Sequence, residues 1–255
     1  MSNSDMQYQS TQQLIQEDQY HFPYHFIPYN VDEVWRISRF LWWGYEYIAV
    51  LDTIVNLIIS YHPKKVLDFG CGDGRLIHEL CREKLAEIVG IDISERARSF
   101  SQAISRHDSR VRIYETFRDI LEERFDAVIA MEVLEHIHPH ELKSILTEIH
   151  TALDEVGLFV ISVPTCNIPL NRKHYRHFTI FEVEQEIDGL FVIDQTYFIH
   201  KIGTLANLLR RMVVNKFVIM NWNPWLKLTT FLYKMYVMNA DEVNGAHLIA
   251  VLRKI

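Results

Sequence analysis

Three side chains that can bind a metal ion or move a proton occur close together in the segment FDAVIAMEVLEHI. Glu132, Glu135 and His136 directly follow an apolar run at residues 125–131. If a helical turn begins at Glu132, these side chains share one face, because residues three and four apart are neighbours on a helix. Two carboxylates and an imidazole can hold a divalent ion, which would lower the pKa of a bound hydroxyl. His136 alone could instead be a general base, and a capped turn with solvated acids fits the same pattern.

A glycine-rich loop lies earlier in the chain, in the segment VLDFGCGDG. Gly70, Cys71 and Gly72 stand between an apolar run and an amphipathic segment, where a tight turn lets the backbone approach a ligand. Asp92 ends the next apolar run, where its carboxylate can accept hydrogen bonds from both hydroxyls of a ribose. The glycines alone also fit a turn without a ligand. Together with Asp92 they predict a site for an adenosine-type ligand.

The charges near this loop indicate which nucleoside it binds. Asp68 precedes the glycines and Asp73 lies among them. Carboxylates would repel a pyrophosphate, since phosphates prefer bare amides at a helix N-terminus. S-adenosylmethionine has a sulfonium, an ammonium and no phosphate, and it suits the acidic loop better than a dinucleotide does.

Short apolar runs alternate with amphipathic segments from Lys65 onward. This alternation is typical of βαβ units, and it predicts an α/β fold with a doubly wound, mostly parallel sheet that has helices on both faces. Ligands bind such sheets at the carboxyl ends of the strands. The expected strands are residues 66–70, 87–92, 111–115, 125–131, 157–163, 191–199 and 246–254, and the expected helices are 73–84, 94–107, 139–153 and one from about Thr179.

Two further segments flank the predicted sheet. Residues 1–60 are interpreted as a polar tail followed by a helical, aromatic-rich cap, and residues 61–255 as the main domain with a cap insertion at about 202–239. The apolar stretch at 40–61 has a polar stripe at helical spacing, and Arg, Lys and Asn interrupt the stretch at 205–238. Neither reaches about 20 clean apolar residues, so no transmembrane helix is expected. The later stretch, aromatic and basic, could contact a membrane surface.

The composition is that of a folded, mildly acidic protein. Of 255 residues, 49% are hydrophobic, and 26 Lys and Arg stand against 33 Asp and Glu. An overall basic field for long nucleic acids is therefore absent, although a local basic groove remains open. The three cysteines form no C-x-x-C pair and suit a reducing compartment, so a cytoplasmic location is expected. Neither Cys71 nor Cys166 has a base at a defined spacing, which argues against covalent catalysis.

Taken together, VLDFGCGDG, Asp92 and FDAVIAMEVLEHI resemble the class I S-adenosylmethionine-dependent methyltransferases over about residues 60–190. The resemblance implies a Rossmann-like sheet of seven strands, with residues 246–254 inserted antiparallel. It also implies a role for each matching residue. Asp68, Gly70, Cys71 and Gly72 would line the methionine part, Asp92 the ribose, and Ile93, Thr116 and Phe117 the adenine, with Asp119 as a further candidate; Met131 and Glu132 would lie beside the sulfonium.

Two subfamilies resemble the chain at the Glu-x-x-Glu-His motif. In ubiquinone-pathway O-methyltransferases, M-E-V-L-E-H is associated with a divalent ion. In small-RNA 2′-O-methyltransferases a later histidine completes the metal site, and its counterpart here is His174, with His177 nearby. This resemblance implies Glu132, Glu135, His136 and His174 as ligands of Mg²⁺, Mn²⁺ or Zn²⁺. Many class I enzymes carry similar motifs without a metal, so a metal-free site with His136 and Glu132 as catalytic residues stays open.

The aromatic residues near both ends of the chain favour a hydrophobic or planar methyl acceptor. We therefore expect O-methylation of a small molecule, such as a secondary metabolite, a glycan or a quinone-like or lipid-like compound. An RNA 3′ end is the alternative acceptor, with basic residues as phosphate contacts. A non-catalytic cofactor-binding module and a hydride-transfer enzyme are further alternatives from other classes. The basic residues in question are Arg172, Lys173, Arg176, Arg210 and Arg211.

Overall fold

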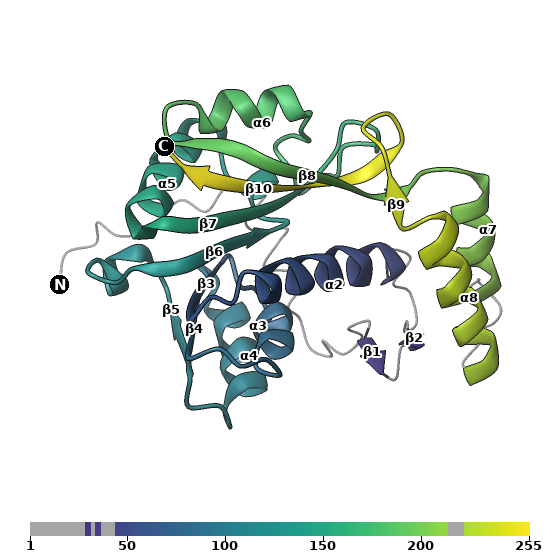
Figure 1. Cartoon of the computed structure of the whole chain (residues 1–255), viewed down its shortest axis with the longest axis horizontal. Coiled ribbons are helices and arrows are strands. Elements are labelled where there is room, and N and C mark those ends of the chain that lie inside the picture. Colours follow the sequence, from purple (N-terminus) through teal and green to yellow (C-terminus); the bar gives the residue numbers. More distant parts are fainter. Residues whose placement is uncertain (1–28, 32–33, 37–43, 214–221) are drawn as a thin grey trace.

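The computed structural model describes residues 29–31, 34–36, 44–213 and 222–255. The predicted polar tail, the aromatic residues at 20–28 and 37–43, and residues 214–221 of the predicted insertion lie outside the described residues. Two short strands, β1 (Tyr29–Val31) and β2 (Val34–Arg36), form an antiparallel pair of their own. All other described strands belong to one sheet (Figure 1).

The main sheet has the order β5-β4-β3-β6-β7-β10-β8-β9. Strands β3 to β7 are mutually parallel, and β10 lies antiparallel between β7 and β8, as the sequence predicted for residues 246–254. The bounds are β3 (Lys65–Phe69), β4 (Glu87–Ile91), β5 (Val111–Tyr114), β6 (Phe125–Met131), β7 (Leu153–Pro164), β8 (Phe191–Lys201), β9 (Asn239–Ala240) and β10 (Gly245–Lys254).

The fold class is confirmed, but the expected count of seven strands is one too low. The additional strand β9 consists of Asn239 and Ala240 only, and it pairs with the outer edge of β8. Two residues make too short a run to show the alternation by which a strand is recognised in a sequence.

Helices cover both faces of the sheet (Figure 1). Neighbouring strand residues point to opposite faces, so Val66 packs into one core and Leu67 into the other. Both cores consist of fully buried apolar side chains, which explains why the strands are continuous apolar runs. The helices are α2 (Gly44–Ser60), α3 (Arg75–Leu80), α4 (Glu95–Ser105), α5 (Pro139–Ala152), α6 (Ile180–Ile187), α7 (Thr204–Val213) and α8 (Asn223–Tyr236).

The sequence placed the helix starts better than it placed one helix's length. Ser94 caps α4 by accepting the Ala97 N–H at 3.0 Å, and Thr179 forms a capping box with Glu182 at the start of α6. Helix α3 is shorter than the predicted 73–84. It begins later because Gly74 has a left-handed φ of 83° and still belongs to the glycine loop, and it already ends at Leu80, with Cys81 as its C-cap.

The two predicted cap segments, in residues 1–60 and at about 202–239, pack against the same sheet. Ile48, Leu51 and Ile54 of α2 and Leu226 of α8 share one buried cluster with the strands. The boundary at residue 60 remains a prediction. Within the described residues, no helix combines the length and the apolar character needed to span a bilayer.

Candidate active site

The glycine loop after β3 adopts backbone conformations that favour glycine. Gly70, Gly72 and Gly74 have φ values of 74°, 53° and 83°. A Cβ atom on Gly70 would stand 2.6 Å from Cγ2 of Val133, so there is no room for a side chain at this position. The N–H groups of Gly70 and Cys71 both donate to the carbonyl oxygen of Ile91, at 2.8 and 2.9 Å. These bonds hold the loop against the carboxyl end of β4.

Asp92 faces the glycine loop from the end of β4. Its Oδ2 accepts the N–H of Gly72 at 2.8 Å, and its Oδ1 accepts the N–H of Ser94 at 2.8 Å. The structure therefore brings together the two motifs that the sequence paired. A carboxylate oxygen can accept more than one hydrogen bond, so an aspartate at this position can also bind ribose hydroxyls.

Asp68 gives the loop an unusual electrostatic character. Its side chain is 2% exposed, and its Oδ2 has no hydrogen-bond partner among the described residues. Burial and the nearby Asp92 and Asp73 raise the pKa of Asp68 to about 8. A buried, incompletely paired carboxyl group in an acidic surrounding fits a cationic ligand, whose charge would favour its ionised form. The site thus suits the sulfonium and ammonium of S-adenosylmethionine.

Cys71 lies in the same loop, in surroundings that do not activate its thiol. Burial, followed by the charge of Asp68, raises the pKa of its thiol well above the ordinary value. A protonated, buried thiol is unreactive, which agrees with the expectation against covalent catalysis.

The residues predicted near the adenine have different surroundings. Ile93 is 67% exposed just beyond β4, so it is free to border a ligand. Thr116 and Asp119 form a capping box on a short 3-10 helix, Phe117–Ile120. The ring of Phe117 is buried and stacks on Phe69 with 5.4 Å between centroids, so that ring belongs to the core. Of the three predicted adenine contacts, only Ile93 presents an open side chain.

The Glu-x-x-Glu-His motif does not form the helical turn proposed from its spacing. Met131 ends β6, and Glu132 follows with a left-handed φ of 56°, a conformation that is costly for a residue other than glycine. A short 3-10 helix then begins only at Leu134. The side chains of Glu132 and Glu135 therefore belong to two different groups.

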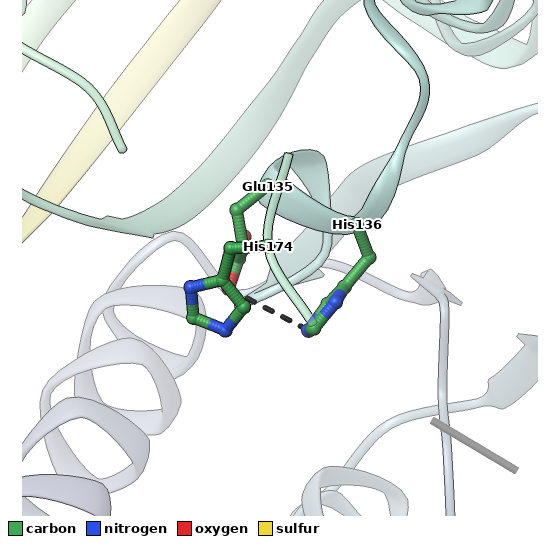
Figure 2. Close-up of side chains that lie close together, drawn as sticks. All are labelled: Glu135, His136 and His174. Carbon is green, nitrogen blue, oxygen red and sulfur yellow. Dashed lines mark ion pairs between the residues drawn. The ribbon is translucent and has the colours of Figure 1, made fainter. Parts of the chain in front are cut away.

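Glu135, His136 and His174 form the first of these groups (Figure 2). One ligand atom from each lies within 4.8 Å of those of the other two. Glu135 is fully buried, and neither of its oxygens has a hydrogen-bond partner among the described residues. Burial and the charge of Glu132 raise its pKa well above the ordinary value. The structure thus assembles three of the four predicted metal ligands.

The hydrogen bonds around the two imidazoles select their tautomers. Nδ1 of His136 lies 3.1 Å from the carbonyl oxygen of Lys173 and therefore carries the hydrogen that it donates to this oxygen, which leaves Nε2 with a lone pair. In the same way Nδ1 of His177 donates to the carbonyl of Ile168 at 3.2 Å, so its Nε2 accepts from Nδ1 of His174 at 2.9 Å. His174 then also has a lone pair on Nε2. The hydrogen bond to His177 fixes the orientation of the His174 ring, as hydrogen-bond partners of metal-binding histidines do.

Both imidazoles are neutral near pH 7. Burial lowers the pKa of His136 to about 4 and that of His174 to about 3. Two neutral imidazole nitrogens beside a buried carboxyl group form a donor set that fits a divalent metal ion. The same neutral His136 can accept a proton without a metal.

Glu132 belongs to the second group, which the sequence did not reveal. Its Oε2 lies 3.1 Å from Nδ1 of His247 in β10, and Nε2 of that histidine lies 3.7 Å from Oε2 of Glu46 in α2. Oε1 of Glu46 in turn contacts Nε2 of His200 at 3.1 Å, and Nδ1 of His200 lies 2.9 Å from the hydroxyl of Tyr233 in α8. We call these five residues the Glu-His chain; it joins four elements to the end of β6.

His247 is the charged centre of the Glu-His chain. Burial opposes its protonation, but the carboxylates of Glu132 and Glu46 outweigh burial and raise the pKa of His247 to about 10. The imidazolium in turn holds the pKa of Glu132 low despite burial. An ionised carboxylate thus lies at the carboxyl end of β6, with one buried oxygen, Oε1, that has no hydrogen-bond partner among the described residues.

The strand order and the acidic glycine loop define a class I methyltransferase. The chain also matches the model of a family described as "Methyltransferase domain" over residues 44–211. This match covers more than half of the chain, so the protein belongs to that family of S-adenosylmethionine-dependent enzymes.

Individual similar proteins agree with this assignment. The chain is 32% identical over 123 residues to a ubiquinone biosynthesis O-methyltransferase of Idiomarina loihiensis. The alignment covers 46% of this chain and 49% of that protein. The chain spans half or less of the length of the curated relatives that it matches first.

Solved structures share the fold at low sequence identity. The N-methyltransferase NodS of Bradyrhizobium japonicum, in complex with S-adenosylhomocysteine, has a TM-score of 0.56 at 14% identity, covering 82% of this chain and 87% of that one. The methyltransferase domain of bacterial-CtHen1-C has a TM-score of 0.55 at 17% identity, covering 82% and 97%.

Proposed function

We propose that this chain transfers a methyl group from S-adenosylmethionine to a hydroxyl oxygen of a small acceptor, such as a secondary metabolite, a glycan or a quinone-like or lipid-like compound. One observation carries the proposal: the segment after β6 that contains the polar groups packs against the glycine loop through Val133. Val133, between Glu132 and Glu135, is the side chain that a Cβ on Gly70 would strike. Any sulfonium held on the loop would thus lie close to the proton acceptors.

The cofactor residues follow from the loop geometry. Asp68, Gly70, Cys71 and Gly72 would surround the methionine part, Asp92 would bind the ribose, and Ile93 would border the adenine. Met131, at the last position of β6, would lie beside the sulfonium, as would Glu132. Thr116 and Phe117 can contribute through their backbone, because their side chains are engaged elsewhere.

The reaction needs one nucleophile and one proton acceptor. The acceptor oxygen attacks the methyl carbon in line with the carbon–sulfur bond, that bond breaks, and the sulfonium leaves as a neutral thioether. The hydroxyl proton passes to His136, which is neutral, or to the ionised Glu132. Holding the oxygen about 3 to 3.5 Å from the methyl carbon would supply much of the rate.

A divalent metal ion fits the same site. Glu135, His136 and His174 would hold it, and such an ion supplies a lower pKa for the acceptor hydroxyl. The support is the buried carboxyl group whose two oxygens have no partner among the described residues, together with the two unprotonated imidazole nitrogens. Glu132, which the motif included among the ligands, pairs with His247 instead.

An RNA 3′ end is the second candidate acceptor. In its favour, His174 joins Glu135 and His136 in space, the combination that the small-RNA subfamily implies. Against it, Arg176 forms an ion pair with Glu186 at 2.6 Å and lies over the ring of Phe178, so this expected phosphate contact is already engaged.

Binding and transfer experiments test the proposal in sequence. Calorimetry should show binding of S-adenosylmethionine and S-adenosylhomocysteine, and no comparable binding of NAD. Methyl transfer from labelled cofactor would then be measured on phenols, catechols, glycans and a short RNA with a free 3′ end. Transfer to none of these acceptors, despite cofactor binding, would favour the non-catalytic module. Transfer to the RNA alone would replace the small-molecule proposal.

Metal use is tested by its own variants. If an ion is bound, calorimetry with Mn²⁺ or Zn²⁺ should show a site that both Glu135→Gln and His174→Gln abolish, and a chelator should stop methyl transfer. If His136 acts without a metal, calorimetry should show no metal site that depends on Glu135 or His174, and a chelator should not change methyl transfer.

A further inference from the structure

Helices α7 and α8 lie together at one end of the molecule, beyond β9 (Figure 1). Their inner residues are buried: Leu209 in α7 and Leu226 and Tyr233 in α8 belong to the core that also contains α2. Packing against this core therefore accounts for the apolar residues on one face of each helix.

The outer face of the same helices is apolar as well. Leu228, Phe231 and Met235 are exposed on α8, and their spacing of three and four residues places them in one stripe. Phe231, for example, is 57% exposed. Leu205 and Leu208 of α7 and Trp222 at the start of α8 are exposed too. We call these six residues the outer stripe. A helix that packs one face on a core normally carries polar residues on the other.

The charge of this region differs in sign from that of the whole chain. Residues 202–240 contain no Asp or Glu, although the chain has 33 of them and a net charge of −7. Lys227 and Lys234 are exposed, and each directly precedes a member of the outer stripe in α8. The region's other basic residues are Arg211, Lys216 and Arg210, of which Arg210 lies near Glu46 of the Glu-His chain and is not counted toward the outer surface.

Apolar side chains flanked by Lys and Arg match the surface of an anionic bilayer. Aliphatic and aromatic groups can enter the boundary between headgroups and acyl chains, while cations contact the phosphates. A second copy of the chain would place one basic surface against the same basic surface, which is repulsive. A nucleic acid would use the cations but would leave the aliphatic side chains unexplained.

We propose that the outer stripe of α7 and α8 docks this protein on an anionic phospholipid membrane. The acidic remainder of the molecule is repelled by such a membrane, so the charge asymmetry also orients the protein with this end toward the lipid. The proposal does not depend on the identity of the methyl acceptor.

Co-sedimentation of the full chain with large vesicles tests the docking. Vesicles of phosphatidylcholine with phosphatidylglycerol should bind the protein, vesicles of phosphatidylcholine alone should bind it less, and salt should weaken the binding. Phe231→Ser should lower the partition coefficient by about tenfold or more, since it removes a buried aromatic ring from the complex. Lys227→Glu should also weaken binding to the anionic vesicles.

A matched variant controls for the loss of an apolar surface residue. Val156 in β7 is 89% exposed and lies outside both helices, so Val156→Ser should bind vesicles like the wild type. Thermal melting and affinity for S-adenosylhomocysteine should be unchanged in Phe231→Ser, which shows that its fold is intact. Docking is overturned if anionic vesicles do not bind the protein at low salt, or if Phe231→Ser and the wild type partition equally. It is also overturned if the wild type is a dimer that Phe231→Ser converts to a monomer.

Discussion

The two halves of the sheet differ in how their functional residues come together. Along β3, β4 and β6 the glycine loop, Asp92 and the Glu-x-x-Glu-His motif each lie directly after a strand. Along β8 and β10 the side chains of the Glu-His chain come from elements up to about 200 residues apart, such as Glu46 in α2 and His247 in β10. In the first half, the site residues lie within short sequence motifs, whereas in the second half tertiary packing brings together residues that are far apart in the sequence.

Removing His247 should have the largest effect in the second half. His247→Ala leaves the carboxylates of Glu132 and Glu46 facing each other without the imidazolium between them. The loss of one partner from a mostly buried ionic group costs about 3 to 5 kcal/mol, so the free energy of unfolding should fall by that amount in urea titrations. The milder Glu46→Gln variant should lose less. If His247→Ala is as stable as the wild type, the Glu-His chain contributes little to the free energy of unfolding.

In the first half, His136→Ala should act on catalysis rather than on folding. General bases contribute about 10² to 10⁴ in rate, so turnover should fall at least about a hundredfold while the affinity for S-adenosylmethionine stays within a small factor. Calorimetry and initial rates measure the two quantities separately. Parallel losses in both would indicate that His136 supports the cofactor site instead.

Asp92→Ala should produce a smaller change, confined to the cofactor. The carboxylate would lose its charged hydrogen bonds to the ribose, which lowers the binding free energy by about 1.5 to 3 kcal/mol. Because Asp92 also accepts the N–H groups of Gly72 and Ser94, Asp92→Asn is the better matched control. Unchanged cofactor affinity in both variants would contradict the ribose role.

The last prediction is the pH dependence of stability that His247 gives to the second half. The pKa of His247 is raised to about 10 in the folded protein, from an ordinary value of 6.5. The folded state therefore binds an extra proton between these values, and its stabilisation is complete below about pH 6.5 and decreases as the pH rises toward 10. The stability difference between the wild type and His247→Gln should shrink over this interval. A constant difference would mean that His247 is not protonated in the folded protein.

The sequence predicted the first half well for a physical reason. A buried parallel strand is a continuous apolar run, and a ligand site lies within a few residues of its end, so position alone predicts that Asp68, Gly70 and Asp92 lie close together; their roles in binding stay predictions. The spacing of Glu132 and Glu135 was misleading, because the helical turn begins only at Leu134. The two carboxylates therefore do not share a helix face, although their charges still interact.

The second half offered weaker signals. Glu46 belongs to the polar stripe of a helix, and the prediction of a strand at 246–254 gave no separate role to His247. Each has an ordinary local explanation, and only the pairing of β10 with β7 and β8 brings His247 between Glu132 and the helix that carries Glu46. An isolated ionisable residue inside an apolar element is the signal that could have identified both.

A crystal structure of the chain with S-adenosylhomocysteine tests the assignment of the glycine loop most directly. We expect the ribose hydroxyls on the carboxylate of Asp92, the amino-acid portion near Asp68, and the sulfur facing the end of β6. A loop closed by its own side chains, or a diphosphate bound in place of the sulfur ligand, would contradict methyl transfer at this site.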